Sequence, residues 1–213
     1  MTPKSRLHIP KPPARPGDKP DFSFLARSAA GEVARPDFKT PASKIENLAH
    51  ELVRVLDDDG VARGEWTPDL SAEQLVGALR LMMLTRQYDM RMQRVQRQGK
   101  ISFYMQSLGE EAVSIGQGMA LDSGDMLFPS YRNQGLFILR GTSLVDMMCQ
   151  CLSNTRDMCK GRQMPIMYHN RQGNLFSVSG NLGTQFPQAV GWAMASAIKG
   201  EDHIAASWVG DGS

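Results

Sequence analysis

Apolar residues between positions 75 and 83 recur at intervals of three and four, the spacing that places them on one face of a helix. The segment Ser71-Ala72-Glu73-Gln74 before them has the form of a capping box, which is typical of a helix start. Gly99 follows the periodic stretch, and glycine commonly ends a helix. The pattern therefore predicts a long helix over residues 71–99.

Further helices and two short strands are predicted along the rest of the chain. The helices cover residues 110–121, a segment that begins at Ser143, and residues 183–199; the strands cover residues 126–128 and 203–209. Helices that alternate with short apolar strands predict an α/β fold, with a parallel sheet flanked by helices. Residues 160–174 lack periodicity and predict a long loop, a kind of segment that is often functional.

The amino-terminal region differs in composition from the rest. Eight of the twelve prolines fall within the first 41 residues, a density that excludes a regular helix or a central strand. We expect an extended proline-rich arm and linker over residues 1–68, followed by the first part of the main domain over residues 69–213. The apolar segment Phe22-Ser23-Phe24-Leu25 can anchor the arm on another surface, although a disordered, unanchored tail fits the sequence equally well.

Composition narrows the class of protein. The chain is 41% hydrophobic and 22% charged, which supports a sizeable core. Its net charge of +2 gives no support for nucleic acid or an anionic membrane as a partner, and no run approaches the ~18 apolar residues of a membrane span. The three cysteines are expected to be small buried hydrophobic residues in a reducing compartment. We expect the bacterial cytoplasm, with the mitochondrial matrix as the alternative.

The last residues, Trp-Val-Gly-Asp-Gly-Ser, follow the second predicted strand directly. In open parallel sheets, ligands bind beyond the carboxyl ends of the strands. Asp211 lies in such a position, and Gly210 and Gly212 beside it allow a tight turn that holds the carboxylate. Magnesium prefers such oxygens, but a single Gly-Asp-Gly is also compatible with an ordinary turn.

Two more segments carry groups that can bind ligands. Tyr131 and Arg132 follow the first predicted strand and offer a phenol and a guanidinium to a phosphate, although surface Tyr-Arg pairs are common. The segment from Ser177 to Gln185 can present backbone groups and hydroxyls to a ligand or a monovalent cation, or can simply cap a helix. His169, alone in the long loop, is expected to be structural or exposed.

Together, the motifs resemble those of a known family. The segments GKISFYMQSLGEEA, SYRNQG, KGRQMP, LGTQFPQAVG and GDGS, in this order and at these intervals, are similar to the alpha subunit of the thiamine-diphosphate-dependent 2-oxo acid dehydrogenases. The GRQMP loop favours the branched-chain type. The resemblance covers about residues 70–213 and is loose in the proline-rich arm. It implies the thiamine-diphosphate-binding fold, incomplete at its carboxyl end.

The resemblance also implies site residues. The cofactor-binding positions are Tyr131, Arg132, Gly180, Leu182, Gly210, Asp211 and Gly212, with Asp211 as a ligand of Mg²⁺. Phe103 and Tyr131 match walls of the substrate pocket; Ser179, Asn181, Thr184 and Gln185 match a potassium site in which Asn181 replaces a usual proline. The main acid–base groups are expected beyond Ser213 and on the beta subunit, so no catalytic residue is assigned.

The activity implied is oxidative decarboxylation of branched-chain 2-oxo acids, with transfer of the acyl group to the lipoyl arm of an acyltransferase core. The implied partner is a beta subunit, in an alpha2beta2 heterotetramer. A pyruvate- or acetoin-type alpha subunit is one alternative, and an inactive fragment or assembly subunit is another. Because the sequence stops inside the cofactor motif, we expect the amino-terminal portion of a longer alpha subunit, inactive by itself.

Overall fold

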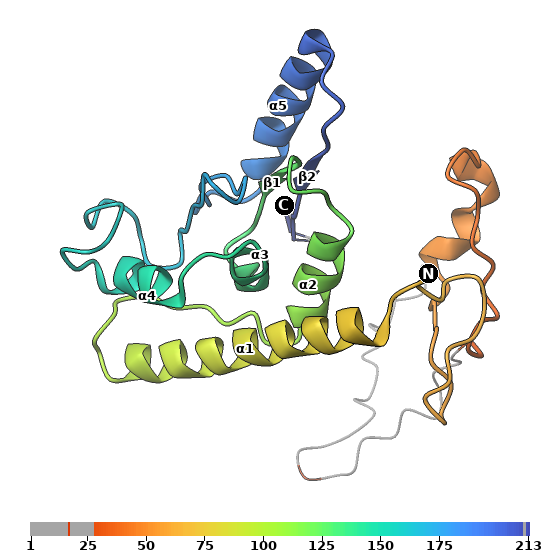
Figure 1. Cartoon of the computed structure of the whole chain (residues 1–213), viewed down its shortest axis with the longest axis horizontal. Helices are drawn as coiled ribbons and strands as arrows, with labels where there is room; N and C mark the ends of the chain where they lie inside the picture. The colour runs from red at the N-terminus through yellow and green to blue at the C-terminus, as the bar shows by residue number, and fades with distance from the viewer. Residues whose placement is uncertain (1–16, 18–27, 211) are drawn as a thin grey trace, which may run out of the picture. The chain divides into compact units, whose positions relative to one another are not determined.

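The computed structural model describes residue 17, residues 28–210 and residues 212–213 (Figure 1). The expected anchor at residues 22–25 and the expected magnesium ligand, Asp211, lie outside the described residues. The chain divides into two compact units, Met1–Asp69 and Leu70–Ser213. The second unit contains the α-helices and the paired strands of the described part.

The described part of the first unit consists of turns and two 3-10 helices, η1 (Ala42–Lys44) and η2 (Glu46–Ala49). Its backbone crosses itself closely, because a Cβ atom on Gly64 would lie 2.4 Å from the Cα atom of Gly31. Both glycines have positive φ angles, which other residues adopt only with strain. Among residues 28–69, Val33 is the one hydrophobic residue that is buried. Residues 28–69 therefore form little core, and the predicted extended arm is not confirmed.

Helix α1 (Ala72–Arg97) confirms the predicted long helix. Its capping box is complete: Ser71 Oγ accepts from Gln74 N at 3.2 Å, and Gln74 Oε1 accepts from Ser71 N at 2.8 Å. The helix ends before Gly99, which has a φ angle of +70°. Its fully buried side chains all come from the second half of the helix, whereas several apolar residues of the first half lie on the surface.

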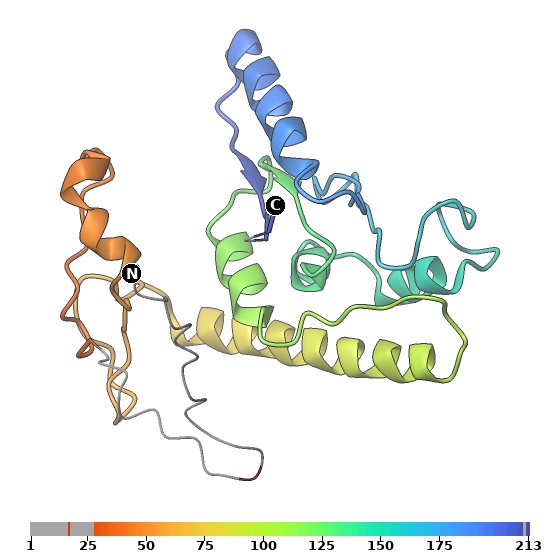
Figure 2. The ribbon, with the colours of Figure 1, turned by 180° about the vertical axis from the view of Figure 1, so that it is seen from behind.

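Helices α2 (Glu111–Met119) and α4 (Leu144–Leu152) were predicted, and α4 begins at the N-cap Ser143. Helix α3 (Gln134–Leu139) was not, because six residues make fewer than two turns and show no usable period. Figures 1 and 2 show α2 and α3 beside α1, and all three helices pack on one another. A Cβ atom on Gly135 would lie 2.9 Å from Ser114 Cβ, so this glycine permits the close approach of α3 to α2.

A small parallel sheet pairs β1 (Met126–Phe128) with β2 (Ala205–Ser207). Phe128 pairs with Ser207, so the carboxyl ends of both strands lie at the same edge. On the other side of β1, Leu127 forms a parallel bridge with Leu175. The structure therefore confirms the α/β class in coarse form, as helices around a small parallel sheet.

The core of the second unit gathers around β1, α3 and the long loop over residues 160–174. Leu127, Leu136 and Ile166 have no exposed surface, and Tyr168 is buried beside them. The loop thus contributes core residues, which its lack of periodicity did not predict.

All three cysteines are free thiols, and Cys149 and Cys151 are buried as predicted. Cys159 is partly exposed. Within the residues that the structure describes, no helix combines the length and the apolar character needed to cross a membrane.

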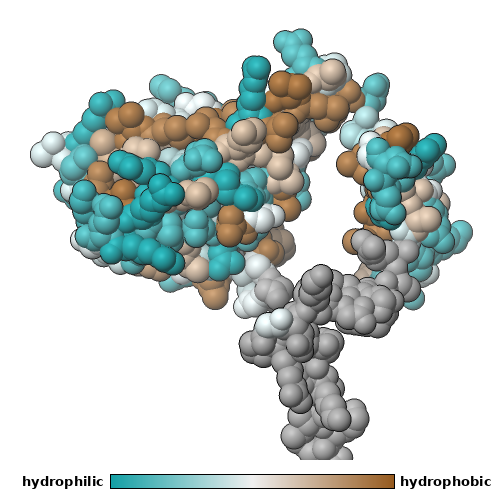
Figure 3. Space-filling model, turned by 90° about the horizontal axis from the view of Figure 1, so that it is seen from below, coloured by the Kyte–Doolittle hydropathy of each residue, from teal (hydrophilic) through white to brown (hydrophobic). Residues whose placement is uncertain are grey.

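Helix α5 (Gln185–Lys199) packs on β1 and β2 and ends at Gly200, close to the predicted bounds. Figures 1 and 2 show it projecting beyond α2 and α3, alongside the segment that leads into β2. Apolar side chains recur every four residues on its exposed face: Phe186 (60% exposed), Val190 (42%), Met194 (61%) and Ile198 (85%). Figure 3 shows hydrophobic side chains gathered in a band on one face of this unit. Such apolar surface is typical of an interface.

Candidate functional site

The loops that follow β1 and β2 meet at the carboxyl edge of the sheet. Trp208 N donates to Phe128 O at 3.2 Å, which holds the second loop against the first strand. Beside the loops lies a cleft of about 390 Å³. Its lining includes these predicted site residues: Tyr131, Arg132, Leu182, Gln185, Gly210 and Gly212. Residues from three separate segments are thereby brought to one place.

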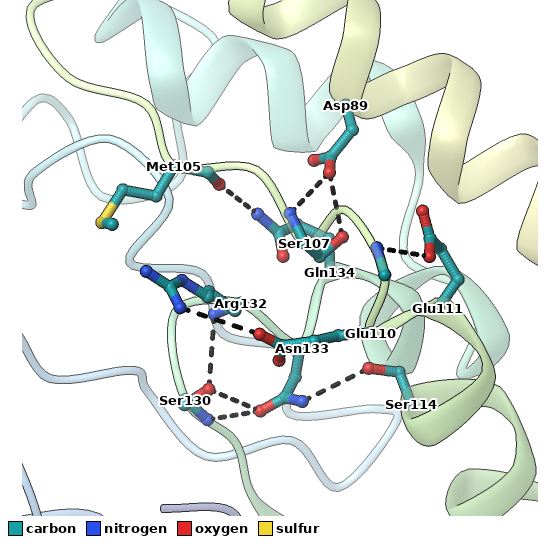
Figure 4. A network of polar contacts seen from close by, with 11 residues as sticks. Asp89, Met105, Ser107, Glu110, Glu111, Ser114, Ser130, Arg132, Asn133 and Gln134 are labelled. Atoms are coloured by element: carbon teal, nitrogen blue, oxygen red, sulfur yellow. Dashed lines mark hydrogen bonds and ion pairs between the residues drawn. The ribbon is translucent and has the colours of Figure 1, made fainter. Parts of the chain in front are cut away.

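Asn133 fixes the loop after β1 to helix α2. Its Oδ1 accepts from Ser130 N and Ser130 Oγ, both at 2.8 Å, and its Nδ2 donates to Ser114 Oγ at 3.3 Å (Figure 4). Asn133 is 2% exposed, so water does not compete for these bonds. The loop that carries Tyr131 and Arg132 is therefore held in position by buried contacts.

Arg132 has hydrogen-bonding capacity that the described residues leave unused. Its guanidinium carbon lies 5.6 Å from the centre of the Tyr131 ring, and its Nη1 lies 3.8 Å from Glu110 Oε1. The second distance is too long for a hydrogen bond, and the side chains are 42% and 41% exposed, so this ion pair is weak. Arg132 Nε is buried with no hydrogen-bond partner among the described residues. A buried charged donor of this kind fits an anionic ligand.

Gln185 and Trp208 join the other side of the cleft. Gln185 Nε2 donates to Trp208 O at 2.6 Å, which links the start of α5 to the loop after β2. Trp208 Nε1 in turn donates to Gln117 Oε1 of α2. Leu182 lines the cleft while 68% exposed, so its side chain is available to a ligand.

The predicted potassium segment forms a compact turn before α5. Ser179 Oγ accepts from Asn181 N at 3.2 Å, and Thr184 N donates to Asn181 O at 3.4 Å. Gly183 has a φ angle of +75°, and a Cβ atom there would lie 3.7 Å from Ser213 Cβ. The turn therefore adjoins the cleft, although Ser179, Asn181 and Thr184 are not among the residues that line it.

Two predicted positions, Phe103 and Gly180, and the lone histidine of the long loop are not among the residues that line the cleft. Phe103 is partly buried against the hydrophobic core and is not among the residues that line the cleft. Gly180 is exposed and is not among the lining residues. His169 lines separate hollows, with its Nδ1 3.5 Å from Cys159 Sγ.

Several lining residues were not predicted, including Glu110, Val113, Asn133 and Trp208. Glu110 and Asn133 belong to the quoted motifs GEEA and SYRNQG, so membership in a motif was the available signal. In the part of the chain that the structure describes, no three His, Cys, Asp or Glu side chains gather as metal ligands. The predicted magnesium site thus depends on Asp211, which lies outside that part.

A parallel sheet with a cleft at its carboxyl edge and an unpaired guanidinium nitrogen beside it is typical of α/β proteins that bind an anionic cofactor. The family model described as "Dehydrogenase E1 component" matches residues 79–213. The model described as "2-oxoisovalerate dehydrogenase E1 alpha subunit N terminal" matches residues 3–43. The chain belongs to the dehydrogenase E1 component family, whose members use thiamine diphosphate, and the resemblance seen in the sequence is confirmed.

Individual relatives agree with the family. The chain is 57% identical to the 2-oxoisovalerate dehydrogenase subunit alpha of Pseudomonas aeruginosa over 207 residues, which cover 97% of this chain and 50% of the relative. It is 38% identical to the mitochondrial counterpart of Dictyostelium discoideum, over 79% of this chain and 39% of the relative. It is 36% identical to the mitochondrial 2-oxoisovalerate dehydrogenase subunit alpha of Bos taurus, over 76% of this chain and 36% of the relative. The chain thus spans half, or less, of the length of these relatives.

Proposed function

We propose that the subunit containing this chain is the alpha subunit of a branched-chain 2-oxo acid dehydrogenase, a 3-methyl-2-oxobutanoate dehydrogenase of the lipoamide type. In this reaction a 2-oxo acid loses carbon dioxide, and its acyl group passes to the lipoyl arm of an acyltransferase core. The observation that supports the proposal most strongly is the cleft at the carboxyl edge of the sheet, where three predicted segments converge beside Arg132. Relatives named as 2-oxoisovalerate dehydrogenase alpha subunits support the branched-chain substrate.

Thiamine diphosphate, when bound, supplies the electron sink for decarboxylation. The residues of this chain bind and orient it. Arg132, whose Nε is buried and without a partner among the described residues, and Tyr131 would hold the diphosphate. Leu182 offers an exposed apolar side chain to the rings of the cofactor, and Gly210 and Gly212 form the adjoining wall.

Two metal ions belong to the proposal. Mg²⁺ would be held by Asp211, flanked by the two glycines that line the cleft, together with diphosphate oxygens. K⁺ would be held by oxygen atoms of the turn before α5, from Ser179, Asn181, Thr184 and Gln185. The oxygen-rich composition of this turn, and its approach to the end of the chain at Gly183, support that assignment.

The beta subunit is the proposed partner, in an alpha2beta2 heterotetramer. The apolar face of α5, defined by Phe186, Val190, Met194 and Ile198, is the surface that we propose for this contact. It carries no charged side chain between its first and last member, which is typical of the core of an obligate interface. If residues further along a longer chain cover the face instead, Met194→Asp should lower the thermal stability of the isolated alpha subunit rather than weaken the heterotetramer.

A branched aliphatic substrate is proposed, with Phe103 and Tyr131 as pocket walls. Because Phe103 lies outside the cleft lined by this chain, the pocket would be completed by other parts of the assembly. The relative in Pseudomonas aeruginosa supports a bacterial cytoplasmic enzyme, and the relatives named as mitochondrial support the matrix as the alternative.

The test is a comparison of substrates on the alpha2beta2 assembly. We expect kcat/KM for 3-methyl-2-oxobutanoate to exceed that for pyruvate about tenfold or more, because each additional buried carbon contributes about 1–3 kcal/mol. A preference for pyruvate would favour the pyruvate- or acetoin-type alternative. Failure to bind thiamine diphosphate with Mg²⁺ in the presence of the beta subunit would favour an inactive or assembly subunit.

A further inference from the structure

A buried carboxylate, Asp89, joins helix α1 to the segment that leads toward the cleft. Asp89 has no exposed surface. Its Oδ1 accepts from the Tyr104 hydroxyl at 2.6 Å, and its Oδ2 accepts from Ser107 N at 2.6 Å and from Ser107 Oγ at 3.0 Å. Figure 4 shows the two bonds from Ser107 converging on this carboxylate. They hold residues 104–107 against the helix.

From residues 104–107, two further hydrogen bonds lead toward the cleft, one to a residue that lines it and one to the helix that follows the Arg132 loop. Ser107 O accepts from Glu110 N at 2.8 Å, and Glu110 lines the cleft. Met105 O accepts from Gln134 Nε2 at 2.8 Å (Figure 4). Gln134 is 1% exposed and lies two residues after Arg132. Asp89 is therefore connected through residues 104–107 to both Glu110 and the Arg132 loop, although no residue of α1 lines the cleft.

The Asp89 carboxylate lies in an environment that disfavours its charge. Burial raises the pKa of Asp89, and the hydrogen bonds from Tyr104 and Ser107 oppose that shift. A buried charge is generally less stabilising than a well-packed apolar residue. Its presence thus indicates a need for an acceptor that can hold three donors in one geometry.

We propose that Asp89 is a positioning residue that sets where Glu110 and Arg132 lie beside the cleft by fixing residues 104–107. The inference rests on the proposed function in one respect, that the cleft binds thiamine diphosphate. Because displacement of about 1 Å in a binding group can lower activity 100-fold, loss of this clamp should weaken binding at a distance.

Asp125 provides a matched control. It is 4% exposed, its Oδ1 accepts from Ile204 N at 2.8 Å, and its Oδ2 accepts from Asp122 N at 2.8 Å. These contacts precede β1 and β2, at the sheet edge opposite the cleft. Asp125 is thus a buried aspartate with a comparable structural role and no connection to Glu110 or Arg132.

The experiment compares Asp89→Ala, Asp89→Asn and Asp125→Ala in the alpha2beta2 assembly. The Kd for thiamine diphosphate plus Mg²⁺ is measured for each by calorimetric titration. We expect Asp89→Ala to raise Kd about tenfold or more. Asp89→Asn should stay within about threefold, since its amide oxygen still accepts from Ser107 N. Asp125→Ala should lower Tm by a comparable amount and leave Kd within about twofold.

If Asp89→Ala does not fold, Tyr104→Phe and Ser107→Ala each remove one side-chain donor, and each should raise Kd about two- to threefold. A wild-type Kd for the alanine variant, or for both milder variants, overturns the proposal. An equal rise of Kd in Asp125→Ala overturns it too, because the effect would then follow stability alone.

A failure of the proposed function is distinguishable from a failure of this inference. If the wild-type assembly binds no thiamine diphosphate, the proposed function is wrong, and hydrogen exchange still tests the clamp. Asp89→Ala should then accelerate exchange at the amides of Ser107 and Glu110, whereas Asp125→Ala should not. Unchanged exchange at both amides would overturn the positioning role of Asp89.

Discussion

The two edges of the β1–β2 sheet are built differently. At the amino edge, both carboxylate oxygens of Asp125 accept backbone N–H groups, and its contacts are complete. At the carboxyl edge, Asn133 and Gln185 hold the loops, but Arg132 keeps a buried Nε with no partner among the described residues. Its ion pair with Glu110, at 3.8 Å, does not satisfy it. The amino edge thus stabilises the fold, whereas the carboxyl edge keeps the Arg132 Nε donor available for a ligand.

This difference separates stability from binding. Substitutions at the amino edge should lower the free energy of unfolding without changing affinity for the cofactor. Substitutions of the unpaired group at the carboxyl edge should have the opposite effect, because that group contributes little to the fold.

The largest effect on stability is expected from Asp125→Ala. Two backbone N–H groups lose their hydrogen bond to a buried carboxylate, each at a cost of about 1–2 kcal/mol, so the free energy of unfolding should fall by about 2–4 kcal/mol. Urea unfolding of the alpha subunit measures this change. A loss below about 0.5 kcal/mol would show that the amino edge is held by other contacts.

Arg132→Ala should have the largest effect on affinity. A hydrogen bond to a charged group contributes about 1.5–3 kcal/mol, which corresponds to a rise of about 10- to 100-fold in the Kd for thiamine diphosphate. Calorimetric titration of the assembly measures Kd, and Tm should hardly change. Arg132→Lys is the control: it keeps the charge without the planar fork and should give an intermediate Kd. An unchanged Kd in both variants would remove Arg132 from the site.

Two glycines of the turn before α5 should respond differently to alanine. Gly183 has a φ angle of +75°, so Gly183→Ala should lower stability by about 1–2 kcal/mol. Gly180 does not have a positive φ angle and has only Met167 Cε near its Cβ position, so Gly180→Ala should change stability by less than about 0.5 kcal/mol. Thermal unfolding distinguishes the pair, and equal losses would contradict the role of backbone strain.

The smallest effect concerns pH. The hydrogen bond from Arg86 lowers the pKa of Glu111 below its ordinary value of 4.5. A lowered pKa in the folded state contributes stability that is complete above the pKa of the unfolded chain and is lost as pH falls through the folded pKa. Because Arg86 is 44% exposed, the contribution is small. Tm measured from about pH 3 to pH 7 should fall on the acid side less steeply in Glu111→Gln than in the wild type. Parallel curves would exclude the ion pair as a source of stability.

Local signals predicted the elements that carry them. The capping box at Ser71 and the apolar run before Pro129 predicted α1 and β1 almost to the residue, and the cap at Ser143 predicted the start of α4. Helix α3 carries no such signal, since it has fewer than two turns and its N-cap makes no side-chain hydrogen bond. Elements marked by local sequence signals, such as helix caps, could therefore be predicted. A short element stabilised mainly by burial, such as α3, could not.

The candidate site was predictable in part for a topological reason. Parallel strands bring their carboxyl ends to one edge, so Tyr131, Arg132 and the glycines after β2 could be expected to meet. The contacts of Asp89 with Tyr104 and Ser107 could not be predicted, because they join residues that are 15 and 18 positions apart in the sequence. They follow only from the packing of the folded chain. Several residues that line the cleft could thus be expected from the sequence, whereas the residues that position its walls require the structure.

The most direct test of the central claim is hydrogen–deuterium exchange of the alpha2beta2 assembly with and without thiamine diphosphate plus Mg²⁺. If the cleft at the carboxyl edge binds the cofactor, exchange should slow in Ser130–Asn133 and in Trp208–Ser213, and should not change around Asp125. Protection confined to other segments, such as the hollow around His169, or no protection at all, would contradict the account.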